Sequence, residues 1–188
     1  ILIRENLIEN SDAIGIEADG IPGGLQLLEN TITGSGQDPL CEGGLGGAGV
    51  RLGGSNSTIS GNIIYSNGNA GVVLNDGSGS GNLISQNSFF ANGTTADALG
   101  IDLDPSGGFG DGVTLNDTGD SDSGPNGLVN FPIIVSAFIS GSDLVVKGWA
   151  RPGSTLEFFF TDINEGTASE GANQLGNSKD YGEGQAYI

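Results

Sequence analysis

Four asparagines recur along the first half of the chain in the same apolar surroundings. They are Asn6, Asn30, Asn62 and Asn87, at spacings of 24, 32 and 25 residues. The residue three positions before each asparagine is Ile or Leu, and the residue two positions after it is Ile or Phe. A repeat period in this range is typical of solenoids, whose units bury their apolar faces by stacking on one another. The chain is therefore constrained to a stacked fold.

A further short segment in each unit begins with glycine, and its first and third following residues are apolar. The four copies are Gly15-Ile16-Glu17-Ala18, Gly49-Val50-Arg51-Leu52, Gly71-Val72-Val73-Leu74 and Gly100-Ile101-Asp102-Leu103. This alternation is the pattern of a strand with one buried face. Each unit thus holds three short strands, and equivalent strands of successive units pair in parallel about 4.8 Å apart. The pattern predicts a parallel β-helix of about four three-strand coils.

The repeated asparagine is expected at the bend between the first and second strands of each coil. There its amide can bond to the asparagines above and below, a ladder that satisfies buried polar groups. A β-sandwich built from the same strands would need hairpin turns of about two to five residues and would leave the repeat period unexplained.

The repeat that runs Ser55-Asn56-Ser57-Thr58-Ile59-Ser60-Gly61-Asn62-Ile63-Ile64 resembles the right-handed parallel β-helix repeat proteins of the pectate-lyase-like class. The resemblance covers residues 1–106. It implies a right-handed helix, and it is shared by polysaccharide lyases, hydrolases, epimerases and non-catalytic surface adhesins. Fold follows from this resemblance, whereas chemistry does not.

The second half of the chain has a different pattern. Residues 107–127 form an acidic Gly/Asp-rich junction, and 128–188 carry longer alternating strands, expected at 131–139, 143–149 and 154–161. The junction resembles the one that leads into an immunoglobulin-like module in large bacterial surface proteins. Roughly 60 residues remain for a sandwich that usually needs about 100, so we expect an incomplete antiparallel module. Its missing strand was removed or comes from another chain, as in donor-strand assembly.

Composition limits the partners. The 23 acidic and 5 basic residues give a net charge of −18, which repels phosphate backbones and argues against nucleic acid. Divalent cations, polysaccharide, other surface proteins or further copies of the chain fit better. No apolar run is long enough to span a bilayer, so membrane insertion is not expected. The chain begins without Met inside a strand pattern, so we interpret it as a mature product or fragment that is extracellular or on a cell surface.

Candidate catalytic residues lie in the outward column of the third strand. Because the chain has no His, acid–base chemistry would fall to carboxylates, Lys or Tyr. Lyases of the resembling family combine calcium-binding carboxylates with an Arg or Lys base, which implies Glu17, Arg51 and Asp102 here. We favour the alternative of a surface ion pair, because Val73 interrupts the column. Asp102 and Asp104 could also serve as paired carboxylates for glycoside hydrolysis, although aspartates are common at strand ends.

The oxygen-rich junction suggests a calcium site, since Ca²⁺ takes six to eight oxygen ligands in flexible geometry. The candidate ligands are Asp102, Asp104, Asp111, Asp117, Asp120 and Asp122. Their spacing matches neither the EF-hand loop nor the nonapeptide calcium repeat. A solvated acidic loop is the alternative.

Tyr65 and Phe90 fall on adjacent coils in another outward column and would stack two aromatic rings. Such a face can pack on sugar rings, which makes these residues candidates for glycan binding, and the alternative is that the rings lie under a loop. The insertion at 34–48, which contains Cys41, lengthens the second coil and offers a projecting loop. Cys41 is the single cysteine, so no internal disulfide forms.

These observations favour a non-enzymatic extracellular surface or adhesin segment, a scaffold or glycan-binding face that calcium could stabilise. The first alternative is a polysaccharide lyase or hydrolase. The second is a filament subunit whose copies join through unpaired strand edges or a donated strand.

Overall fold

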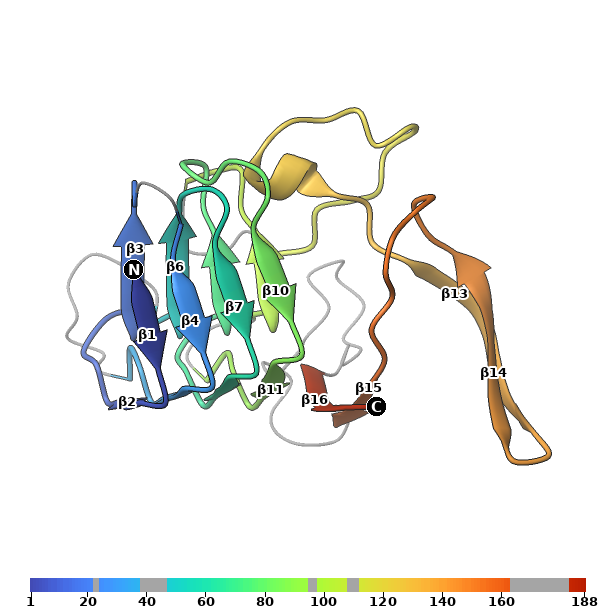
Figure 1. Cartoon of the computed structure of the whole chain (residues 1–188), viewed down its shortest axis with the longest axis horizontal. Coiled ribbons are helices and arrows are strands. Elements are labelled where there is room, and N and C mark those ends of the chain that lie inside the picture. Colours follow the sequence, from blue (N-terminus) through green and yellow to red (C-terminus); the bar gives the residue numbers. More distant parts are fainter. Residues whose placement is uncertain (22–23, 38–46, 95–97, 108–111, 163–182) are drawn as a thin grey trace.

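The computed structural model describes residues 1–21, 24–37, 47–94, 98–107, 112–162 and 183–188. Twelve short strands wind into four coils of three strands each (Figure 1). The first sheet contains β1 (Leu2–Arg4), β4 (Gln26–Leu28), β7 (Thr58–Ser60) and β10 (Leu83–Ser85). The second contains β2 (Leu7–Glu9), β5 (Thr31–Thr33), β8 (Ile63–Tyr65) and β11 (Ser88–Phe90). The third contains β3 (Ile16–Asp19), β6 (Val50–Gly53), β9 (Val72–Leu74) and β12 (Ile101–Leu103).

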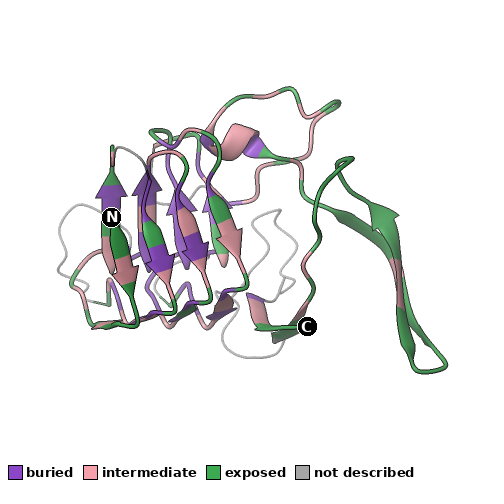
Figure 2. Ribbon diagram, viewed as in Figure 1, coloured by how far each residue is buried: buried purple, intermediate pink, exposed green. Residues whose placement is uncertain are grey.

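All strand neighbours in these three sheets pair in parallel, one coil above the next, which confirms the predicted parallel β-helix. The apolar columns seen in the sequence form one stacked core. Leu27, Ile32, Leu52, Ile59 and Ile64 are fully buried at its centre. Figure 2 shows this buried band running through the inner coils.

A glycine precedes each third strand, and in the first three coils the next coil approaches too closely for a side chain at that position. A Cβ on Gly49 would lie 2.7 Å from the carbonyl oxygen of Gly71, and a Cβ on Gly71 would lie 2.7 Å from that of Gly100. The core also leaves no room for a side chain at Gly71, where a Cβ would lie 2.6 Å from the Phe89 ring. The glycine column thus reports coil-to-coil contact.

Each bend before a ladder asparagine uses a left-handed backbone. Glu5, Glu29, Gly61 and Gln86 precede the four asparagines and have φ values of 57°, 55°, 67° and 54°. This conformation is costly for residues other than glycine, so something must hold it in place. At the first three bends the following asparagine does so, because its Nδ2 donates across the bend to the carbonyl of Arg4, Leu28 or Ser60.

The predicted asparagine ladder is present. Oδ1 of Asn30 accepts the Asn6 backbone N–H at 3.0 Å and its Nδ2 at 3.1 Å. Asn62 repeats the arrangement toward Asn30, at 2.9 and 3.0 Å, and Asn87 repeats it toward Asn62, at 2.9 and 2.8 Å. One amide per coil therefore locks each bend to the next.

After the coils, the described residues form a 3-10 helix η1 (Pro125–Leu128) and two antiparallel strand pairs. β13 (Ile133–Ser140) pairs with β14 (Asp143–Trp149), and this hairpin extends away from the coils (Figure 1). β15 (Phe159–Asp162) pairs with β16 (Glu183–Tyr187), beside the last coil. Within the described ranges, no helix is long and apolar enough to cross a membrane.

The strands expected in the C-terminal half are present in part. The strands expected at 131–139 and 143–149 are present as β13 and β14, whereas the strand expected at 154–161 begins at Phe159. Each antiparallel sheet has two strands among the described residues. The incomplete immunoglobulin-like module stays a prediction.

Candidate functional site

The ion pair expected on the third sheet is formed, and it has an additional member. Glu17 lies opposite Arg51 in the strand register, and Arg51 Nη1 lies 2.6 Å from Glu17 Oε1 and 3.0 Å from Asp19 Oδ2. The Arg51 side chain is only 14% exposed. Its guanidinium is therefore committed to two carboxylates of the same sheet.

Asp102 is set apart from this pair. Val73, which is fully buried, lies between Arg51 and Asp102 in the column. Asp102 is 2% exposed and accepts the backbone N–H of Gly112 at 3.0 Å. Asp104 is also buried and accepts the backbone N–H and hydroxyl of Ser106. The structure thus joins Glu17 to Arg51 but brings neither of them to Asp102 or Asp104.

Tyr65 and Phe90 stack on adjacent coils, as the column predicted. Their ring centroids are 4.7 Å apart and the ring planes differ by 11°. The two rings are therefore nearly parallel and stacked with an offset. Both side chains are half-buried. Each ring covers one face of the other, so a sugar ring could contact only the remaining faces and the edges of Tyr65 and Phe90.

Three of the six predicted metal ligands meet in one loop. Asp117, Asp120 and Asp122 each place a carboxylate oxygen within 4.8 Å of the other two. Backbone–side-chain pairs between Asn116 and Phe131, at 2.9 Å in both directions, close this loop at its base.

The three carboxylates differ in their partners. The backbone N–H and the hydroxyl of Ser121 donate to Asp117 and lower the pKa of its carboxyl group below the ordinary value. Asp120 accepts the Asn130 N–H at 2.7 Å and pairs with Arg151 at 2.7 Å. Oδ1 of Asp122 is buried, and no hydrogen bond reaches it from the described residues.

The remaining candidate ligands lie elsewhere. Asp102 and Asp104 are held at the end of β12 by their own hydrogen bonds, outside the group of three. Asp111 falls outside the described residues, as do Cys41 and most of the insertion at 34–48.

Two more polar ladders, which sequence reasoning missed, end on residues from the C-terminal half. In one, Asn92 Oδ1 accepts the N–H and Nδ2 of Asn67, and Asn92 in turn donates both groups to the carboxylate of Glu183 at 2.9 Å. In the other, Ser57 donates its N–H to Asn82, whose own N–H donates to Asn126 Oδ1 at 3.0 Å. Glu183 and Asn126 thus occupy the positions of a fifth-coil side chain.

Glu157 fixes a third corner of the last coil. Its carboxylate accepts the hydroxyl of Ser85 and the N–H of Gln86. β16 lies along β11, where the Ser88 hydroxyl donates to the Gln185 carbonyl at 2.5 Å. Three side chains from widely separated positions therefore cap the polar ends of the coils.

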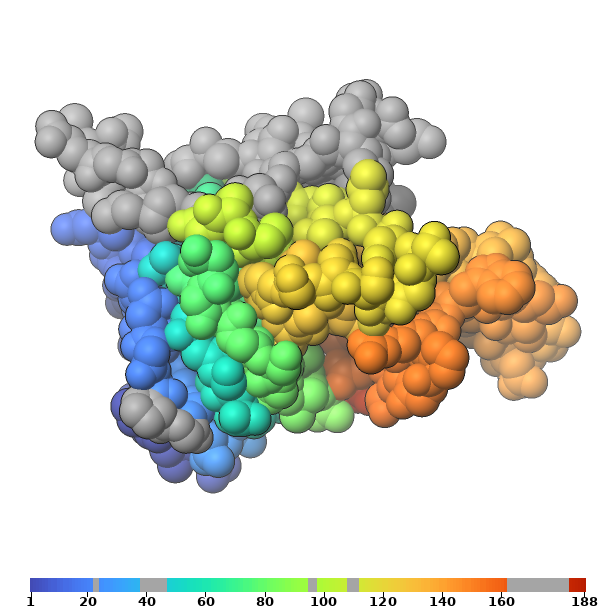
Figure 3. All heavy atoms as spheres, turned by 90° about the horizontal axis from the view of Figure 1, so that it is seen from above, coloured from blue at the N-terminus to red at the C-terminus, as the bar shows by residue number. Residues whose placement is uncertain are grey.

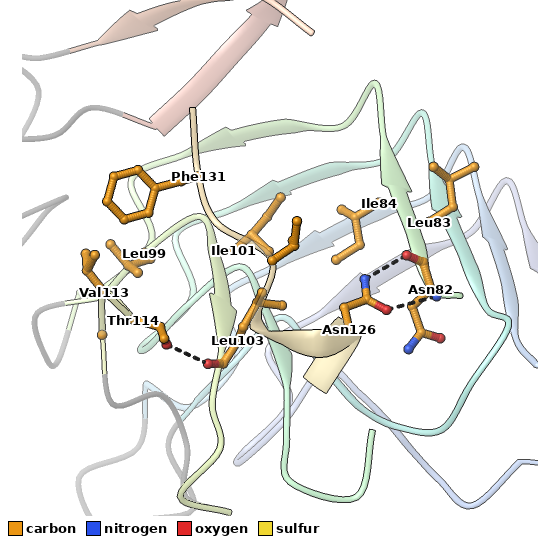
Figure 4. A pocket seen from close by; sticks show the side chains of 12 residues that line it. Asn82, Leu83, Ile84, Leu99, Ile101, Leu103, Val113, Thr114, Asn126 and Phe131 are labelled. Carbon is orange, nitrogen blue, oxygen red and sulfur yellow. Dashed lines mark hydrogen bonds between the residues drawn. The ribbon is translucent and has the colours of Figure 1, made fainter. Parts of the chain in front are cut away.

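The cap leaves a cavity of about 620 Å³ over the last coil (Figure 4). Its walls are mainly apolar and include Ile84, Leu103 and Phe131. The polar groups drawn at its edge are already paired, since Asn126 bonds Asn82 and Thr114 bonds the Leu103 carbonyl. Figure 3 shows the segment that contains η1 lying against the coils, with the β13–β14 hairpin projecting beyond it.

Comparison with known proteins gives one match. A family model described as the right handed beta helix region matches residues 1–126, which include all four coils and the start of η1. No curated protein and no solved structure matches the chain.

Proposed function

The chain belongs to the right-handed β-helix family, and we propose that it is a non-catalytic scaffold of an extracellular surface protein with a glycan-binding side. The fold alone serves enzymes and surface proteins equally, so the proposal depends on the side chains. The observation that carries it is the commitment of the candidate acid–base groups to structural bonds.

Catalysis of acid–base type needs a group that can reach substrate and exchange a proton. Arg51 is held between Glu17 and Asp19, and Asp102 is covered and bonded to Gly112. These arrangements favour structural roles. Tyr65 and Phe90 remain as outward aromatic groups suited to contact with sugars.

Glycan binding should depend on the aromatic pair. We expect retention on neutral polysaccharides to fall at least tenfold in the double variant Tyr65→Ala/Phe90→Ala, because loss of ring contacts worth about 1.4 kcal/mol changes affinity tenfold. Affinity electrophoresis across a polysaccharide panel measures this. The matched control is Thr33→Ala, in the same outward column one coil before Tyr65, which should leave retention unchanged. Equal retention of all variants would remove the aromatic pair from the proposal.

The same panel tests the lyase or hydrolase alternative, because it also records product release. Binding without products supports the scaffold. Release of unsaturated or reducing ends that disappears in Arg51→Ala would replace the scaffold proposal with an enzyme whose base is Arg51.

We further propose that Ca²⁺ binds at Asp117, Asp120 and Asp122. The specific support is Oδ1 of Asp122, which belongs to this group of three carboxylates, is buried, and receives no hydrogen bond within the described part of the chain. Asp120 would bind metal with its Arg151 partner displaced or shared, so the expected affinity is modest.

Calcium at 100 times its dissociation constant should stabilise the fold by about 2.7 kcal/mol, and excess EDTA should reverse the effect. Thermal unfolding with and without Ca²⁺ measures the change. Asp122→Asn should abolish the calcium response, whereas Asp143→Asn in the exposed β13–β14 turn should retain it. A melting temperature indifferent to millimolar Ca²⁺ would leave this loop as a solvated acidic segment.

A further inference from the structure

A second pocket lies where the β13–β14 hairpin meets the acidic junction. Its volume is about 450 Å³, which is within the range of small-molecule sites. The junction loop contributes Asn116, Asp117 and Asp120 to its walls. The end of β14 and the turn that follows contribute Trp149 and Arg151. The pocket therefore brings together two parts of the chain that are distant in sequence.

Hydrogen bonds hold the junction side of this pocket in place. Oδ1 of Asn130 accepts the Asp117 N–H, and Nδ2 of Asn130 donates to the Asp117 carbonyl, both at 2.9 Å. The Asn130 N–H also donates to Asp120 Oδ1 at 2.7 Å. Arg151 Nη1 lies 2.7 Å from Asp120 Oδ2 and joins the hairpin to the junction. The pocket is thus preformed, which lowers the entropy cost of binding a ligand.

Trp149 presents a wide aromatic surface at this pocket. It is 74% exposed, although an indole ring usually contributes most when it is buried. In the strand register Trp149 lies opposite Ile133, which also lines the pocket. This part of the wall therefore has apolar surface available for contact with a ligand.

The pocket also offers a hydrogen-bond donor and an acceptor. The guanidinium of Arg151 has several N–H donors, and Asp120 engages it through Nη1. The Arg151 side chain is 56% exposed, so its other N–H groups can reach a ligand. Oδ2 of Asp117 accepts two bonds from Ser121, whereas Oδ1 accepts a long bond of 3.4 Å from Asn130. Asp117 Oδ1 can therefore accept a further hydrogen bond.

We propose that this pocket binds a sugar ring of a neutral oligosaccharide, independently of the aromatic pair on the coils. A pyranose ring has an apolar C–H face that can pack on an indole, and its hydroxyl groups both donate and accept hydrogen bonds. Trp149 matches the first property, and Arg151 with Asp117 matches the second.

Charge separates a neutral sugar from other ligands of similar size. An anionic ligand is disfavoured, because Asp120 neutralises Arg151 and the chain carries a net charge of −18. An organic cation would have to compete with Arg151 for the carboxylates of the pocket. A neutral polyhydroxyl ligand avoids both costs. With one aromatic surface and few hydrogen bonds, a dissociation constant of about 1 mM is expected.

Trp149 supplies a direct signal, because it is the only tryptophan of the chain. The test is fluorescence titration of the full chain with short neutral oligosaccharides of glucose, mannose or galactose, in EDTA so that no metal is needed. We expect a saturable change in Trp149 emission with at least one of these sugars and none with oligogalacturonate or tetramethylammonium. The response should persist in Tyr65→Ala/Phe90→Ala, which separates this pocket from the glycan-binding side proposed above.

Calorimetric titration in the Tyr65→Ala/Phe90→Ala background extends the test to variants without the indole. Trp149→Ala should weaken sugar binding at least tenfold, and Trp149→Phe should recover part of the affinity because it keeps an aromatic face. Phe138→Ala is the matched control, since it removes another exposed ring of the same hairpin that does not line the pocket, and it should leave binding unchanged. Circular dichroism confirms that each variant is folded.

Four results would overturn the proposal. One is a Trp149 emission that no neutral sugar changes at concentrations up to about 10 mM. Another is a response that disappears in Tyr65→Ala/Phe90→Ala, because the sugar would then bind at the coils. The third is equal affinity of the Trp149→Ala and Phe138→Ala variants. The fourth is a response to oligogalacturonate or tetramethylammonium alone, which would assign the pocket to a charged ligand.

Discussion

Replacing Asn62 with alanine should reduce the free energy of unfolding by about 3–5 kcal/mol, because several buried groups lose partners at once. Oδ1 of Asn62 accepts the N–H and Nδ2 of Asn30, and its Nδ2 donates to Asn87 Oδ1 and to the Leu27 carbonyl. Asn62 is 1% exposed, so water cannot replace these bonds without opening the coils. Urea unfolding followed by far-UV circular dichroism measures the loss.

Asn6→Ala is the control for this prediction. Asn6 has the equivalent position in the coil that begins at β1, but its side chain is exposed, and its N–H and Nδ2 donate to Asn30. Its removal should cost about 1 kcal/mol or less, in the range of one solvent-accessible hydrogen bond. Similar losses for both variants would mean that the ladder does not hold the coils together.

The four coils could be predicted because their determinants are local and repeated. Three inward columns and one asparagine column recur at nearly constant spacing, so each copy supports the others. Part of the second ladder had the same signal, since Asn67 and Asn92 are separated by 25 residues, as Asn62 and Asn87 are. Its other members are Ser35 and Glu183, and this change of residue type hid the column.

The C-terminal half could be predicted only in part. Alternation and turn residues were sufficient for β13 and β14, which pair with each other. The strand expected from Ser154 begins only at Phe159. The residues before it contact the coils, where Glu157 bonds Ser85, a residue 72 positions earlier in sequence. No pattern within a single segment reports such a partner.

The candidate metal ligands could also be predicted only where their arrangement depends on residues that are close in sequence. Asp117, Asp120 and Asp122 are close in sequence and meet in space, whereas Asp102 and Asp104 belong to the end of a strand. Alternation correctly placed Asp102 on the outward side of its strand, but the side chain is buried there and not exposed to solvent. Its burial depends on the Gly112 segment, which returns over it.

The cap of the last coil leads to the second large effect. Glu183→Ala should destabilise the chain by about 2–4 kcal/mol, because the N–H and Nδ2 of Asn92 lose charge-assisted acceptors in a buried position. The change should also release β16 from β11. Hydrogen exchange measures this release directly, as faster exchange at Asn92 and along β16, and urea unfolding measures the stability.

The Glu183→Gln variant tests whether Glu183 stabilises the cap through its hydrogen bonds or through its negative charge. A single amide oxygen accepts both donor groups where one asparagine follows another, as Asn92 Oδ1 does for Asn67 and Asn87 Oδ1 does for Asn62. A glutamine at 183 can therefore continue the ladder and should remain within about 1 kcal/mol of the wild type. If the Gln variant instead loses as much stability as the Ala variant, the carboxylate charge holds the cap, and Glu183 does not stand in for a fifth-coil asparagine.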